Sequence, residues 1–134
     1  MTLVDTNVLI DVLSDDPIWF DWSAASLDRR GDIGAIFINE IIFAELAVQM
    51  DSEAELEQAL AALKVTLART PAPALFIAGK AYGRYRAAGG IRTGVLPDFF
   101  IGAHAQVVQW PLLTRDVHRY RAYFPDVELI APTG

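Results

Sequence analysis

The sequence predicts an α/β fold in three layers, α/β/α, with a central, mainly parallel sheet. Short apolar runs that indicate buried strands alternate along the chain with segments of helical periodicity. A sheet of this kind is covered by helices on both faces and binds ligands beyond the carboxyl ends of its strands. The length of 134 residues, 53% of them hydrophobic, suits one core. We therefore expect a single domain over residues 1–134.

The amino-terminal third predicts a strand followed by two helices. Residues 2–4 form a short apolar run, and apolar residues then recur at helical spacing over 8–13. A second helix is predicted over Pro17–Arg30. Asp16 can cap its start, and Gly31 is expected to end it.

The middle of the chain predicts two further strands separated by two helices. Both helices carry capping signals: Asn39 precedes the first, and Ser52 with Glu55 forms a capping box at the second. In order, the predicted elements are a strand over 35–38, a helix over 40–50, a helix from 53 to about 63 and a strand over 65–67.

The carboxyl-terminal half continues the alternation. A long helix closes at Gly89 and Gly90, and the glycine-bearing segment 90–94 predicts a flexible loop. In order, the predicted elements are a helix over 71–88, a helix from 97 or 98 to about 108, a strand over 111–114, a helix ending at 123 and a strand over 127–130.

The composition restricts the chemistry. Without cysteine the chain has no disulfide, thiolate zinc site or thiol nucleophile, and only His104 and His118 could offer nitrogen ligands. Oxygen atoms would have to hold any metal. No apolar run reaches the roughly 18 residues of a membrane span, so we expect a cytoplasmic protein without membrane contact.

The net charge of −6 is unevenly distributed. Residues 1–57 hold thirteen acids and two arginines, whereas residues 58–134 hold four acids and nine bases. A basic half is compatible with a polyanionic partner, even though the whole chain is acidic.

Four acids stand out by position. Asp5 and Asp116 each follow a predicted strand, and Asp98 opens an apolar helix, where a capping role explains each of them equally well. Glu45 lies among apolar helical neighbours, so it needs a metal or an internal arginine as partner. If the four converge, Mg²⁺ or Mn²⁺ would relieve their repulsion and could activate water against a phosphodiester.

Four segments together resemble the PIN-domain ribonucleases, and most closely the VapC toxins among them. Each segment contains one of the four acids, and the resemblance spans nearly the whole chain in the right order. The segments are Leu3–Val8, Ile41–Leu46, Leu96–Ala105 and Leu113–Asp116.

The resemblance implies a PIN-like fold and the toxin of a type II toxin–antitoxin pair. It implies an endoribonuclease dependent on Mg²⁺, with Mn²⁺ as the alternative ion, that cleaves transfer or ribosomal RNA. The expected partners are the RNA, a VapB-like antitoxin and a second copy of the chain, with DNA bound only through the antitoxin. The implied metal-binding and catalytic residues are Asp5, Glu45, Asp98 and Asp116, supported by Thr6, Asn7 and Thr114.

Several other residues invite a functional or a structural interpretation. The candidate phosphate contacts are arginines, although arginines on helices are more often solvated or paired. We expect Glu40 to be solvated, His104 to pack in the core, and one aromatic residue of segment 18–22 to lie on an exposed patch. The candidate contacts are Arg84, Arg86, Arg92 and Arg115, with Arg119 and Arg121 as further possibilities.

Two alternative functions remain open at this point. An aspartate-based phosphoryl-transfer domain, like a receiver or a phosphatase, would also place Asp5 at a strand end. Asn7 in place of a second aspartate opposes it. A catalytically inactive PIN-like binding module is the other alternative, which the presence of all four acids opposes.

Overall fold

The computed structural model describes residues 1–92 and 94–133. Thr93 of the predicted flexible loop lies outside the described residues. The helices are α1 (Thr6–Leu13), α2 (Phe20–Ile33), α3 (Glu40–Ala47), α4 (Glu53–Ala62), α5 (Ala72–Ala87), α6 (Leu96–Val108) and α7 (His118–Tyr123). The strands are β1 (Thr2–Val4), β2 (Ile36–Ile38), β3 (Val65–Leu67), β4 (Leu112–Leu113) and β5 (Leu129–Ile130).

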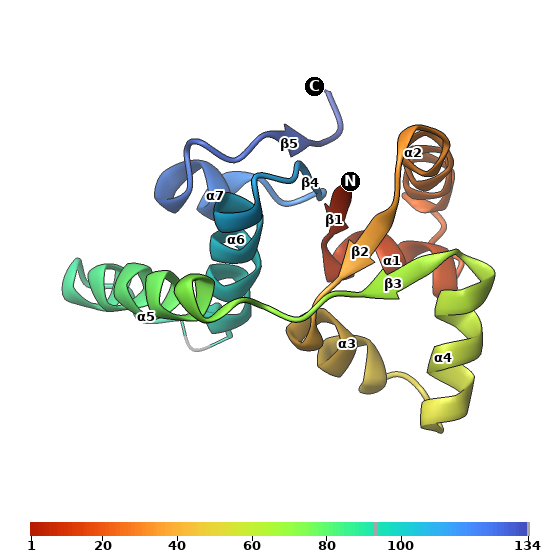
Figure 1. Ribbon diagram of the computed structural model, residues 1–134, viewed down its shortest axis with the longest axis horizontal. Coiled ribbons are helices and arrows are strands. Elements are labelled where there is room, and N and C mark those ends of the chain that lie inside the picture. Colours follow the sequence, from red (N-terminus) through yellow and green to blue (C-terminus); the bar gives the residue numbers. More distant parts are fainter. Residues whose placement is uncertain (93, 134) are drawn as a thin grey trace.

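The five strands form one sheet in the order β3-β2-β1-β4-β5, and every pairing in it is parallel. This confirms the predicted three-layer α/β/α class. The chain extends from β1 towards β3 and then returns to the other side of β1 for β4 and β5. Figure 1 shows α1 to α4 beside β1, β2 and β3, and α5 to α7 beside β4 and β5. The strand order thus reverses between β1 and β4, which is where open α/β sheets place their ligands.

The central strands β1 and β4 are short and buried. Leu3, Val4, Leu112 and Leu113 are fully buried, so β1 and β4 lie entirely inside the molecule. Their apolar runs end at Asp5 and Thr114, where polar side chains take over. The transition from apolar strand to polar residue places functional groups at the carboxyl edge of the sheet.

Local capping signals fix the starts of two helices as predicted. The Asn39 side chain accepts a hydrogen bond from the backbone N–H of Ile42 at 3.0 Å, at the start of α3. The Ser52 hydroxyl accepts one from Glu55 N–H at 3.1 Å, at the start of α4. Each bond satisfies a backbone donor that has no partner within its helix.

The predicted limits of α2 are wrong at both ends. Asp16 accepts hydrogen bonds from the N–H groups of Ile18 and Trp19, which makes a separate turn before the helix begins at Phe20. At the other end the helix continues through Gly31 and stops before Gly34. A glycine within a helix costs about 1 kcal/mol relative to alanine, which is too little to end a helix by itself.

Two interpretations of single residues can now be judged. His104 is buried and its Nδ1 lies 3.1 Å from the amide of Asn39, so the core role is confirmed. The solvated role of Glu40 is wrong: its carboxylate accepts hydrogen bonds from both the N–H and the hydroxyl of Thr70. Burial acts to raise the pKa of Glu40, but the bonds from Thr70 outweigh it and lower that pKa. Glu40 therefore ties the start of α3 to the segment before α5.

The helices also bear on membrane contact. Within the described part of the chain, none of them combines the length and the apolar character of a membrane span.

Candidate active site

Asp5 occupies the carboxyl end of β1 and is buried, with 5% of its surface exposed. One carboxylate oxygen caps α1 by accepting a hydrogen bond from Thr6 N–H at 2.8 Å. The other accepts hydrogen bonds from the hydroxyls of Thr114 and Tyr120, both at 2.8 Å. Burial nevertheless raises the pKa of Asp5 to about 6, since the donors offset only part of the desolvation and the charge of Asp98 adds to it.

Thr114 and Asn7 join the ends of β1 and β4. Thr114 donates its single hydroxyl proton to Asp5 and accepts the backbone N–H of Asp116 at 3.0 Å. The Asn7 amide lies 3.3 Å from both Asp5 and Thr114, and its carbonyl oxygen accepts Arg115 N–H at 3.1 Å. These polar residues hold the loop after β4 against the start of α1, which is the supporting place expected for them.

Glu45 lies on α3 at the edge of the same region and is half-buried. Its carboxylate accepts the hydroxyl proton of Thr6 at 2.6 Å. The internal salt bridge considered for Glu45 is absent among the described residues. The apolar neighbours of Glu45 predicted a buried face of α3, and this prediction is wrong in part. Ile42 is buried, but Val48 is 85% exposed, so this face of α3 reaches solvent.

Asp98 lies in the first turn of α6 and forms an ion pair with Arg119 of α7, at 2.8 Å. The guanidinium of Arg119 also lies over the ring of Tyr85, 5.5 Å from its centroid. Burial raises the pKa of Asp98 despite this cation, and the charges of Asp116 and Glu45 act in the same direction. The neighbouring acids are therefore close enough to repel one another.

Asp116 completes the set from the exposed loop that follows β4. Asp5, Glu45, Asp98 and Asp116 all line one open cavity of about 240 Å³, together with Thr6, Asn7 and Ile10. The structure thus brings all four predicted acids to one place, at the reversal point of the sheet. Four carboxylates around one cavity form a strongly anionic site, which a hard cation would stabilise.

The donor set suits Mg²⁺ or Mn²⁺ in kind, because it offers carboxylate, hydroxyl and amide oxygens and no sulfur. No three acidic or histidine side chains of the described chain stand in a preformed metal-binding arrangement. The contacts above give the reason. Asp5 accepts hydrogen bonds from four donors, Asp98 pairs with Arg119 and Glu45 accepts the Thr6 hydroxyl, so a cation would compete with these protein donors.

Two residues in the site gave no distinct signal in the sequence. Tyr120 was not among the predicted site residues, yet its hydroxyl donates a hydrogen bond to Asp5 from 115 positions away. Arg119 was one of several possible phosphate contacts, yet it pairs with Asp98. Both lie on α7, a short helix whose periodicity does not indicate which side chains point at the acids.

The other candidate arginines fall into two groups. Arg84, Arg86 and Arg92 are exposed on and after the end of α5. Arg115 is partly exposed and holds Asp11 through two hydrogen bonds, of 2.6 and 2.9 Å. Since Asp11 is almost fully buried, this pair anchors the loop that carries Asp116.

Comparisons with known proteins agree with the fold. A family model described as PIN domain matches residues 2–125. The crystal structure of VapBC2 from Rickettsia felis bound to a DNA fragment from its promoter is similar, with a TM-score of 0.74, 18% identity, and 98% of each chain covered.

A toxin–antitoxin complex from Klebsiella pneumoniae gives a TM-score of 0.69 at 21% identity, with 99% of this chain and 98% of that chain covered. FitAcB from Neisseria gonorrhoeae gives 0.67 at 22%, with 97% and 96% covered. At these identities the structures support the fold alone. The comparison with curated proteins gives no match.

Proposed function

Because the chain belongs to the PIN domain family, we propose that it is a metal-dependent endoribonuclease and the toxin of a toxin–antitoxin pair. The observation that carries the nuclease proposal is the convergence of Asp5, Glu45, Asp98 and Asp116 on one cavity. Mg²⁺ or Mn²⁺ held by these four acids would lower the pKa of a bound water and neutralise charge on a phosphodiester.

The chain's own residues divide the work at this cavity. Thr114, Tyr120 and Thr6 fix the orientation of Asp5, and Asn7 fixes the loop that presents Asp116. Arg119 forms an ion pair with Asp98 in the first turn of α6, so its guanidinium lies directly beside the acidic cavity. If Asp98 held a cation in place of this pair, the guanidinium of Arg119 would be free to contact a phosphate oxygen of the substrate.

The toxin role is supported by what the similar structures are, namely VapBC2 bound to promoter DNA and a toxin–antitoxin complex. We propose an antitoxin of the same kind as the partner of this chain, with DNA reached only through it. A homodimer in the cytoplasm and cleavage of transfer or ribosomal RNA remain predictions of the family resemblance.

The test is cleavage of total RNA by the purified chain, freed of any partner, with Mg²⁺ and with EDTA. We expect cleavage that EDTA abolishes. Asp116→Asn and Asp98→Asn should lower the rate by at least about a hundredfold, and Asp126→Asn, an exposed acid outside the cavity, is the matched control. Equal rates in the site variants and the control would remove the four acids from the reaction.

The absence of cleavage by the partner-free chain would favour the alternatives instead. Labelling by acetyl phosphate would then identify a phosphoryl-transfer domain.

A further inference from the structure

A second cavity adjoins the acidic one across the loop after β4. This groove has a volume of about 630 Å³ and is walled by the end of the chain after β5, by α7 and by the turn before α2. Asp116 lines the acidic cavity, whereas its two neighbours in sequence, Arg115 and Val117, line the groove. The loop therefore lies between the two cavities, so an extended polymer bound in the acidic cavity would reach the groove by crossing this one loop.

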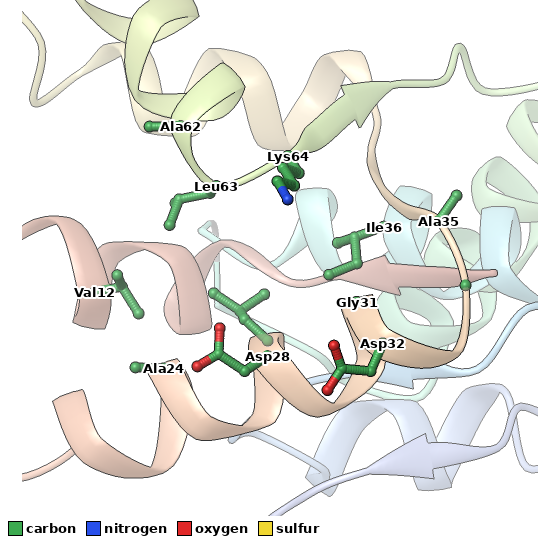
Figure 2. A pocket seen from close by; sticks show the side chains of 12 residues that line it. Val12, Ala24, Asp28, Gly31, Asp32, Ala35, Ile36, Ala62, Leu63 and Lys64 are labelled. Carbon is green, nitrogen blue, oxygen red and sulfur yellow. The ribbon is translucent and has the colours of Figure 1, made fainter.

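The groove has the charge that a polyanion requires. The described residues that line it include Arg115 and Arg121 and no acidic side chain. Four other cavities of the described chain each contain at least two carboxylates. Figure 2 shows one of them, at the opposite ends of the strands, where Asp28 and Asp32 extend from α2 below Lys64. In a chain of net charge −6, a groove without acids beside the candidate active site is a distinctive feature.

The two arginines differ in what they can offer. Arg115 is neutralised by buried Asp11, but its Nη1 makes no hydrogen bond to the described residues. Arg121 is exposed and takes no part in the ion pairs of the described chain. Because Arg119 and Arg121 are two positions apart on α7, they point to different sides of that helix. One faces Asp98 and the other lines the groove.

An aromatic ring completes the lining. Trp19 is half-buried, with the Arg115 guanidinium 4.9 Å from its ring centroid and Trp22 packed edge-on at 6.2 Å. These contacts hold the indole in a fixed orientation at the groove wall. A fixed aromatic ring beside a positively charged groove is the combination on which single-stranded nucleic acids bind, with bases stacked and phosphates paired.

From this arrangement we infer that the groove of Trp19, Arg115 and Arg121 binds the unpaired strand of the RNA substrate that extends from the acidic cavity. The inference rests on the proposed ribonuclease function and deepens it by assigning the path of the substrate. Trp19 stacks on a base, Arg121 contacts a phosphate, and the apolar wall that includes Val117 and Pro132 contacts ribose and base edges.

Binding is measured by fluorescence anisotropy with a short single-stranded RNA of mixed sequence, in EDTA so that no cleavage occurs. Arg121→Ala should weaken binding about fivefold and lower the slope of log K against log salt by about 0.7, the value for one phosphate contact on a single strand. Arg29→Ala, an exposed arginine of α2 outside the groove, is the charge-matched control and should change neither quantity.

The stacking contact has its own pair of variants. Trp19→Leu should weaken binding about tenfold without changing the salt slope, whereas Trp19→Phe should retain most of the affinity because a ring remains. Circular dichroism establishes that both variants fold. If leucine and phenylalanine behave alike while the fold is intact, Trp19 does not stack on the RNA and the inference is wrong.

The lack of cysteine allows a direct test of position. Thr133→Cys places a single thiol at the groove, and Ala61→Cys places one on α4 as the control. A photo-crosslinker on the first thiol, but not on the second, should attach to RNA. If a polypeptide that co-purifies with the chain shields the first thiol and RNA does not, the groove is a protein-docking surface and the inference is overturned.

Cleavage activity distinguishes a wrong substrate path from a wrong ribonuclease function. If the wild-type chain cleaves RNA but the groove variants and the cross-link show no contact, the path assigned to the substrate is wrong and the ribonuclease proposal stands. If the wild-type chain neither cleaves nor binds RNA, the proposed function itself is wrong.

Discussion

Replacing Tyr120 by phenylalanine removes one hydroxyl beneath Asp5 and leaves the ring in the core. Tyr120 is 1% exposed, and its hydroxyl donates to the Asp5 carboxylate at 2.8 Å. Burial raises the pKa of Tyr120 well above its usual value, and the negative charges of Asp5 and Asp98 add to this. The hydroxyl is therefore a permanent donor to Asp5 throughout the working pH range.

The expected magnitude follows from the energy of that bond. A hydrogen bond to a charged group contributes about 1.5–3 kcal/mol, which corresponds to about one to two pKa units. Without the bond, the pKa of Asp5 should rise from about 6 towards about 7 to 8. At pH 7 the ionised fraction would then fall from about nine-tenths to between about a half and a tenth. The variant should therefore bind a divalent cation more weakly, and its cleavage should need a higher pH.

The assay is a carbon-detected NMR titration of the Asp5 carboxyl in metal-free protein, with the signal assigned by its loss in Asp5→Asn. Tyr123→Phe is the matched control, because Tyr123 lies on the same helix and makes no hydrogen bond to Asp5. A midpoint in Tyr120→Phe equal to that of the wild type and the control would refute the argument that this hydroxyl stabilises the ionised carboxylate.

Three further predictions concern stability. In metal-free protein, folding disfavours ionisation of Asp5, so the stability that its protonated form contributes to the wild type is lost as pH rises from about 4 to about 6. The free energy of unfolding of Asp5→Asn in urea, relative to that of the wild type, should therefore grow by about 3 kcal/mol over that range. A constant difference would contradict the raised pKa. Arg115→Ala leaves the buried Asp11 carboxylate unpaired and should cost about 3 kcal/mol in urea unfolding, more than Asp11→Asn; the reverse order would show that the anchor does not depend on that charge. Gly102→Ala places a methyl group 2.4 Å from a buried aromatic ring and should lower stability by about 1–3 kcal/mol, whereas Gly79→Ala meets nothing within 4 Å and should raise it by up to about 1 kcal/mol; thermal melts that fail to separate the two would contradict the packing described here.

The elements could be predicted because their signals are local, whereas the convergence of the four acids stayed a hypothesis until the family resemblance implied it. The apolar run of β1 ends at Asp5 and that of β4 ends at Thr114, two positions before Asp116, and parallel topology brings strand ends to one edge. The capping and functional interpretations of Asp5 also proved compatible, since one oxygen caps α1 and the other faces the hydroxyls. A capping residue at a strand end can therefore belong to a site as well.

The partners of the acids could not be predicted, because they depend on contacts between distant segments. Tyr120 reaches Asp5, and Arg115 reaches Asp11, across more than a hundred positions of sequence. The apolar periodicity around Glu45 wrongly predicted a buried helix face for a related reason. Periodicity shows which residues share a face of a helix but not whether a neighbouring element covers it, and Val48 is left exposed.

The same contacts explain how an acidic cavity can be stable without a cation. Thr114, Tyr120 and the cap of α1 compensate Asp5, Arg119 compensates Asp98, and Thr6 compensates Glu45. Each donor makes ionisation less costly and also competes with a metal for the carboxylate oxygens. Burial still raises the pKa of Asp5 and of Asp98, so compensation by the protein alone is incomplete. A bound divalent cation would offset the remaining cost of ionising these carboxylates. Cation affinity therefore depends on Tyr120 and Arg119 as well as on the four acids.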